Sequence, residues 1–122
     1  MKVFLAFKSL VSYSKKRKFY KLLTFFNLRG FSVKLSDYIA DFLSKITGHA
    51  FTGHGGCIVH LLDSLESHPK IKIVPCQNEQ GASMSAEAYA RVSRGVGLGI
   101  ATSGPGMINL LQGIACAYFD SI

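Results

Sequence analysis

Glu79 is the residue whose type and position most directly suggest acid–base chemistry in this sequence of 122 residues. It follows shortly after the apolar run 71–74 and precedes a run of small residues in which Ala82, Ala86 and Ala90 recur at helical spacing. The start of a helix favours the ionised form of a carboxylate, whereas burial favours the protonated form. The position therefore predicts either a partly desolvated acid–base group or a first-turn glutamate that only complements the helix dipole.

Two glycine-rich turns provide a second candidate feature. They read Gly53-His54-Gly55-Gly56 and Ser103-Gly104-Pro105-Gly106. Such turns indicate close approach of the backbone to another group, or a positive φ angle. Neither turn fits the dinucleotide-binding pattern or the phosphate-binding P-loop. Taken alone, they are explained at least as well by tight strand-to-helix turns that bind nothing.

A metal site is not expected. His49, His54, Cys57 and His60 follow one another at a spacing that matches no standard zinc pattern. The three cysteines are odd in number and widely spaced, so a disulfide framework is not indicated, and a reducing, cytoplasmic setting fits best. No nucleophile-elbow motif for a serine hydrolase is present.

The elements that must position these residues alternate between helix and strand. Apolar side chains at i, i+3, i+4 and i+7 predict a helix capped by Ser36 with the stripe Ile39, Phe42, Leu43 and Ile46, and a second helix with the stripe Ile58, Leu61, Leu62 and Leu65. Short strands are expected at 49–53, 71–74 and 96–102, and further helices at 80–92 and 107–118. This order predicts an α/β fold with a parallel sheet flanked by helices on both faces. Ligands bind such sheets at the carboxyl ends of the strands, where Glu79 and both glycine turns fall.

Charge divides the chain into two parts. Residues 1–34 hold nine of the 14 Lys and Arg residues and no acid, whereas residues 35–122 hold all seven acids and have a net charge of −2. We interpret 1–34 as a basic N-terminal extension: a transit peptide, an arm that touches membrane or nucleic acid, or a segment without a function of its own. Residues 35–122 form the domain, and their charge gives no reason to expect nucleic acid. The uncharged run 95–119 contains glycines and Pro105, so we interpret it as strand, turn and helix rather than a membrane span.

Three linked motifs resemble one protein family. They are the run 78–82 with the helix segment 86–91, the run 101–106 with Asn109, and the run 115–121. In order and spacing they are similar to the N-terminal pyrimidine-binding domain of thiamine-diphosphate enzymes of the acetolactate synthase and pyruvate oxidase type, whose pattern reads roughly HEQxAxxxAxGYAR, TSGPGxxN and AxxDS. The resemblance covers residues 35–122.

The resemblance implies specific roles. Glu79 matches the family glutamate that bonds to N1′ of the cofactor's aminopyrimidine, which makes the 4′-amino group acidic enough to become an imine that takes the C2 proton. Gly104, Pro105, Gly106 and Asn109 match the turn and the asparagine that lie against the pyrimidine ring. Thr102 lies beside them, and Gly53, from the first glycine turn, completes the cofactor-binding set.

The sequence departs from the family pattern at four positions. Thr52 and His54 replace a glycine and a proline of the first glycine turn, which leaves the substrate open, and Asn78 replaces a common histidine. Glu87 replaces a glycine, and we interpret it as an exposed change on the helix.

At the level of function, we expect an N-terminal fragment of an acetolactate synthase-like lyase or transferase that decarboxylates or ligates 2-oxo acids. The alternative is a non-catalytic remnant, or a subunit that needs a separate diphosphate-binding chain. The implied cofactor is thiamine diphosphate with Mg²⁺, the metal being bound by a domain absent from this chain, and the resemblance leaves FAD open. The implied partners are a 2-oxo acid and further copies of the complete protein in a dimer or tetramer, with no nucleic acid and no membrane.

Overall fold

The structure, a computed structural model of the chain, describes residues 33–122. The predicted basic extension at 1–34 therefore lies outside the described residues except for its last two positions. The elements follow the order α3 (Leu35–Ser44), β1 (His49–Thr52), the 3₁₀ helix η1 (Gly56–Ile58), α4 (Val59–Glu66), β2 (Lys72–Pro75), α5 (Glu79–Ser93), β3 (Leu98–Ile100) and α6 (Pro105–Phe119). Strands alternate with helices, as the hydrophobic periodicity predicts.

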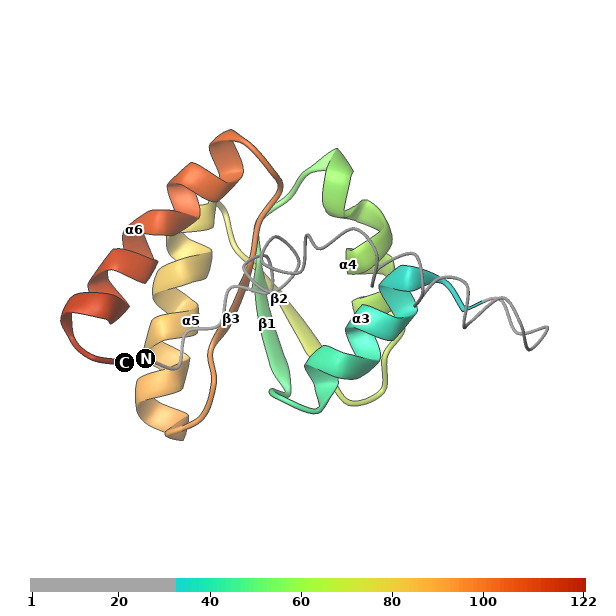
Figure 1. The fold of residues 1–122 in the computed structure, drawn as a ribbon, viewed down its shortest axis with the longest axis horizontal. Coiled ribbons are helices and arrows are strands. Elements are labelled where there is room, and N and C mark those ends of the chain that lie inside the picture. Colours follow the sequence, from blue (N-terminus) through green and yellow to red (C-terminus); the bar gives the residue numbers. More distant parts are fainter. Residues whose placement is uncertain (1–32) are drawn as a thin grey trace, which may run out of the picture.

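The three strands form one parallel sheet in the order β2-β1-β3. Figure 1 shows α5 and α6 on one side of this sheet and α3 and α4 on the other. The predicted α/β fold with helices on both faces is therefore confirmed. The third strand is shorter than the predicted 96–102, because only Leu98–Ile100 pairs with β1.

The main hydrophobic core lies between the sheet and the α3/α4 layer. Its buried members are Ala40, Leu43, Ala50, Leu65, Ile71, Leu98 and Ile100. The prediction for Phe42 is wrong: this side chain is 47% exposed, because the buried face of α3 centres on Ala40 and Leu43. Ser36 does not cap α3 either. The helix begins at Leu35, and the Ser36 hydroxyl instead accepts a hydrogen bond from Ser64 at 2.9 Å.

Small residues bring α5 and α6 close together on the other face. A β-carbon on Gly113 of α6 would lie 2.3 Å from the hydroxyl oxygen of Ser83 on α5, so only glycine fits there. Ala82, Ala86 and Ala90 are buried, which confirms the close packing predicted from their spacing. The run 95–119 forms β3, a turn and α6, and no described helix has the length and apolar character needed to cross a bilayer.

Glu87 is not on the exposed side of α5, and the interpretation as an exposed change is wrong. Glu87 is only 8% exposed, because position 87 shares the buried face of the helix with Ser83 and Ala90. Its Oε1 atom accepts a hydrogen bond from Nε of Arg91 at 3.1 Å, and the Arg91 guanidinium also contacts Asp120 at the end of α6. These two carboxylates, Glu87 first, raise the pKa of Arg91.

Candidate functional site

The carboxyl ends of the strands lie level with one another. Thr52 of β1 is in register with Pro75 of β2 and with Ile100 of β3. The pairing extends one step further, because the amide of Gly53 donates to the carbonyl of Ile100 at 2.9 Å and the amide of Cys76 donates to the carbonyl of Thr52 at 2.9 Å. The turns that follow the three strands therefore begin at the same edge of the sheet, where parallel α/β folds bind their ligands.

Glu79 is the first residue of α5, and its position is fixed by a helix cap. Oδ1 of Asn78 accepts a hydrogen bond from the amide of Gly81 at 2.7 Å, which satisfies one of the free donors at the helix start. This explains why asparagine suits position 78, where the family pattern has a histidine. The cap was visible in the sequence as an asparagine directly before the helix, but it was not predicted.

The Glu79 carboxylate lies in a cradle formed by two glycines and one amide. A β-carbon on Gly53 would be 2.8 Å from Cγ of Glu79 and 3.1 Å from Oε1, and one on Gly106 would be 3.2 Å from Oε1. Nδ2 of Asn109 donates to Oε2 at 3.3 Å. The side chain is half-buried. Oε1 thus lies close to the backbone of both glycines, whereas Oε2 accepts from a side-chain donor.

Thr102 lies two residues beyond the end of β3, at the same edge of the sheet. A β-carbon on Gly55 would be 2.4 Å from Cβ of Thr102, and one on Gly106 would be 2.8 Å from its Cγ2. Gly55 therefore belongs to the site, although it was not among the predicted site residues. Its place in the first glycine turn was the signal that could have identified it.

Gly104 and Pro105 shape the turn rather than contact Glu79. Gly104 has φ 75°, a conformation that favours glycine, and Pro105 occupies the first turn of α6, where its missing amide hydrogen costs little. Both residues are exposed. The structure thus brings Gly53, Glu79, Thr102, Gly106 and Asn109 together, with Gly104 and Pro105 at the rim.

No cluster of three or more His, Cys, Asp or Glu side chains with the geometry of a metal site occurs within residues 33–122. Cys57, Cys76 and Cys116 are free thiols.

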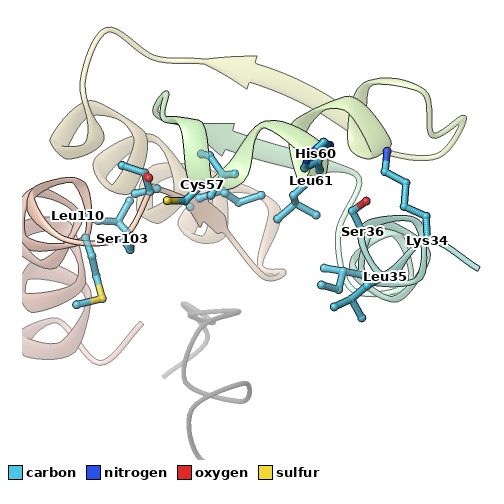
Figure 2. Close-up of a pocket in the computed structure, with 15 residues that line it drawn as sticks. Lys34, Leu35, Ser36, Cys57, His60, Leu61, Ser103 and Leu110 are labelled. Atoms are coloured by element: carbon cyan, nitrogen blue, oxygen red, sulfur yellow. The ribbon is translucent and has the colours of Figure 1, made fainter. Parts of the chain in front are cut away.

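A cavity of about 570 Å³ lies beside the cradle. Figure 2 shows it between the start of α3, the η1–α4 segment and the first turns of α6. Its walls are mainly apolar, with Lys34, Ser36 and His60 on one side and Ser103 on the other. Thr102 lines the cavity and also lies against Gly106 of the cradle, so the two features adjoin.

The fold is a parallel α/β domain that gathers backbone turns around one carboxylate, at the edge where folds of this class bind ligands. The family model described as thiamine pyrophosphate enzyme, N-terminal TPP binding domain, matches residues 33–122. The chain therefore belongs to this family.

Among curated proteins, the chain is 46% identical over 77 residues to the acetolactate synthase large subunit of Porphyra purpurea, an alignment that covers 61% of this chain and 13% of that protein. It is 43% identical over 68 residues to the acetolactate synthase large subunit of Lactococcus lactis, covering 56% of this chain and 12% of that protein. It is 35% identical over 92 residues to an uncharacterized protein of Methanocaldococcus jannaschii, covering 75% of this chain and 18% of that protein. The chain thus spans about an eighth to a fifth of the length of these relatives.

Proposed function

We propose that this chain supplies the aminopyrimidine-binding half of a thiamine-diphosphate site in an enzyme that decarboxylates or ligates 2-oxo acids. The observation that carries the proposal is the Glu79 carboxylate, held between Gly53 and Gly106 by Asn109 at the carboxyl edge of the sheet. The matched relatives named acetolactate synthase large subunits support the same reading and do not favour a non-catalytic remnant.

The cradle fits an aminopyrimidine ring on physical grounds. Gly53 and Gly106 let the Glu79 side chain lie directly against the backbone, so its carboxyl group is presented at the strand edge where the ring would bind. A ring nitrogen also needs a partner that can share a proton, and a half-buried carboxyl group can do so.

In this proposal the residues of the chain bind and orient the ring. Glu79 holds or shares a proton at the ring nitrogen N1′, while the backbone at Gly104, Pro105 and Gly106, with Thr102 beside it, positions the ring. When bound, thiamine diphosphate supplies the carbanion chemistry that breaks or forms the bond next to the carbonyl group of the 2-oxo acid.

The charged end of the cofactor needs other ligands. Mg²⁺ requires several oxygen ligands in near-octahedral geometry, and residues 33–122 contain no acidic cluster that would serve. We therefore propose, as the family resemblance implies, that the diphosphate and Mg²⁺ are held by a part of the complete protein other than residues 33–122.

The surface of α6 supports assembly into a homo-oligomer, a dimer or tetramer, in the complete protein. The helix contains no charged residue, and its large apolar side chains are exposed: Ile108 by 64%, Leu111 by 46%, Tyr118 by 64% and Phe119 by 82%. Apolar surface of this kind is usually covered by another protein surface. The free thiols are consistent with a cytoplasmic location.

The test is to map binding on the chain itself by NMR. Thiamine diphosphate added at about millimolar concentration should shift the backbone amides of Gly53, Glu79 and Gly106, because these line the cradle. Thiamine-free diphosphate should not. Two results would contradict a pyrimidine site. In the first, thiamine diphosphate shifts only the amides of Lys and Arg residues. In the second, diphosphate alone shifts the cradle amides as much as thiamine diphosphate does.

A further inference from the structure

We propose that Asn109 is a positioning residue that acts through Glu79: its amide group selects which carboxylate oxygen meets the cofactor. This inference rests on the proposed thiamine-diphosphate site and deepens it. The resemblance to the family places Asn109 against the pyrimidine ring, whereas the structure places its side-chain nitrogen 3.3 Å from Oε2 of Glu79.

The two oxygens of Glu79 have different surroundings. Oε2 accepts the hydrogen bond from Asn109. Oε1 lies against the backbone at Gly53 and Gly106, where a β-carbon would come within 3.1 Å and 3.2 Å of it. Asn109 already occupies Oε2, so in this proposal Oε1 is the oxygen that is offered to a ligand.

The hydrogen bond also makes the two oxygens chemically unequal. A carboxylate oxygen that accepts a hydrogen bond from an amide is disfavoured as a site of protonation, because the donor stabilises negative charge there. In this proposal, Oε1 is the oxygen that shares a proton with the ring nitrogen. Asn109 thus orients the carboxyl group and directs its proton toward the ligand.

The position of Asn109 makes this role separable from the fold. Its side chain is exposed and lies in the first turns of α6, so its removal opens no cavity in the core. Gln112, three residues further along the same helix, carries the same chemical group and is also exposed, which makes it a matched control.

The first test uses this chain without cofactor. The sequence contains only three glutamates, Glu66, Glu79 and Glu87. Glutamate labelled with ¹³C at its side-chain carboxyl carbon therefore gives three side-chain NMR signals. The Glu79 signal should shift in Asn109→Ala and stay in place in Gln112→Ala. Conversely, the side-chain amide signal of Asn109 should move in Glu79→Ala. If neither signal responds, the hydrogen bond is absent in solution and the inference is wrong.

The second test is a double-mutant cycle in the protein that joins this chain to the diphosphate-binding region. Asn109→Ala should slow C2 proton exchange of bound thiamine diphosphate about tenfold, the factor that corresponds to one lost hydrogen bond, while Gln112→Ala should not. In a Glu79→Ala background, Asn109→Ala should have no further effect on exchange or cofactor affinity.

The outcomes separate the two levels of the proposal. An effect of Asn109→Ala that persists without Glu79 would mean that Asn109 acts on the ring directly, and the inference would fail while the proposed function stands. Unchanged exchange in Asn109→Ala would also overturn it. If the parent protein does not bind thiamine diphosphate, the proposed function itself is wrong, and the inference falls with it.

Discussion

The backbone at Gly53 and the side chain of Glu79 pack so closely that they exclude any β-carbon between them. A β-carbon at position 53 would lie 2.8 Å from Cγ of Glu79, well inside ordinary van der Waals contact. This contact joins the end of β1 to the start of α5, and it determines which surface the carboxylate presents. Glycine at 53 is therefore a requirement of the site rather than of the turn alone.

Gly53→Ala should displace the Glu79 side chain and destabilise the domain. Overpacking of this kind usually costs about 1–3 kcal/mol in the free energy of unfolding. Chemical denaturation gives the energy, and the NMR signal of the Glu79 side chain reports the displacement. Gly56→Ala is the control, because a β-carbon there meets nothing within 4 Å. Equal effects of the two substitutions would show that the cradle is looser than the structure indicates.

The edge that carries the site was predictable because it depends on local rules. Continuous apolar strands alternating with helices predict a parallel sheet, and parallel strands end at one edge. These rules place Gly53, Glu79 and Thr102 at that edge from the sequence alone. The spacing of Ala82, Ala86 and Ala90 likewise predicted a closely packed helix, as the structure confirms.

What the sequence could not provide were contacts between residues far apart in the chain. Asn109 and Glu79 are 30 residues apart, and no local pattern indicates their hydrogen bond. Glu87 was misplaced because a charged residue suggests a solvent-exposed position, whereas its ion pair with Arg91 allows burial against α6. Phe42 was misplaced because the apolar stripe on α3 is wide enough to fit two faces, and only packing against α4 selects one.

Asp63 makes the stability of the domain slightly dependent on pH. Its hydrogen bond from Lys34, 2.9 Å long, lowers the pKa of Asp63 below its ordinary value. The resulting stability is present above about pH 4 and is lost as the pH falls through the lowered folded-state value. Asp63→Asn should therefore have a slightly lower melting temperature than the parent at pH 7. This difference in melting temperature should disappear at about pH 2. The effect is small because the pair is exposed. Glu66→Gln, on the same helix, is the control. A difference in melting temperature that persists at about pH 2 would show that the Lys34–Asp63 pair is not its cause.

Removal of residues 1–33 should leave the domain folded. These residues share neither the charge balance nor the periodicity of the rest, and the shortened chain keeps Lys34, whose carbonyl accepts from the amides of Asp37 and Tyr38 at the start of α3. Circular dichroism and thermal melting of both forms provide the measurement. A collapse of the shortened chain would show that the segment packs on the core.

The chain by itself should bind thiamine diphosphate no tighter than about millimolar. The cradle offers partners for the ring alone, and the ligands that would anchor Mg²⁺ and the phosphates are assigned to another region. Calorimetry with Mg²⁺ present checks the affinity. Micromolar binding by the isolated chain would mean that the phosphate ligands lie within these 122 residues, and the assignment of the diphosphate to another region would be wrong.

The role of Glu79 can be tested by a change that preserves its shape. Glu79→Gln keeps an oxygen near Asn109 and a side chain of the same size between Gly53 and Gly106, so the fold and most of the cofactor affinity should survive. The substitution removes the carboxyl proton. If proton transfer contributes what general acid–base catalysis usually does, turnover in the protein that joins this chain to the diphosphate-binding region should fall about 10²- to 10⁴-fold.

The control for this experiment must be an exposed glutamate whose replacement leaves the packing of the domain unchanged. Glu87 is unsuitable, because it is buried and paired with Arg91, so its replacement would disturb the α5 packing. Glu66, exposed at the end of α4, serves instead. The decisive measurement is C2 proton exchange of the bound cofactor, followed by NMR in Glu79→Gln, Glu66→Gln and the parent. Exchange should slow only in the first of these. Equal rates in all three would show that Glu79 merely complements the dipole of α5, because a carboxylate with that role has no proton to deliver.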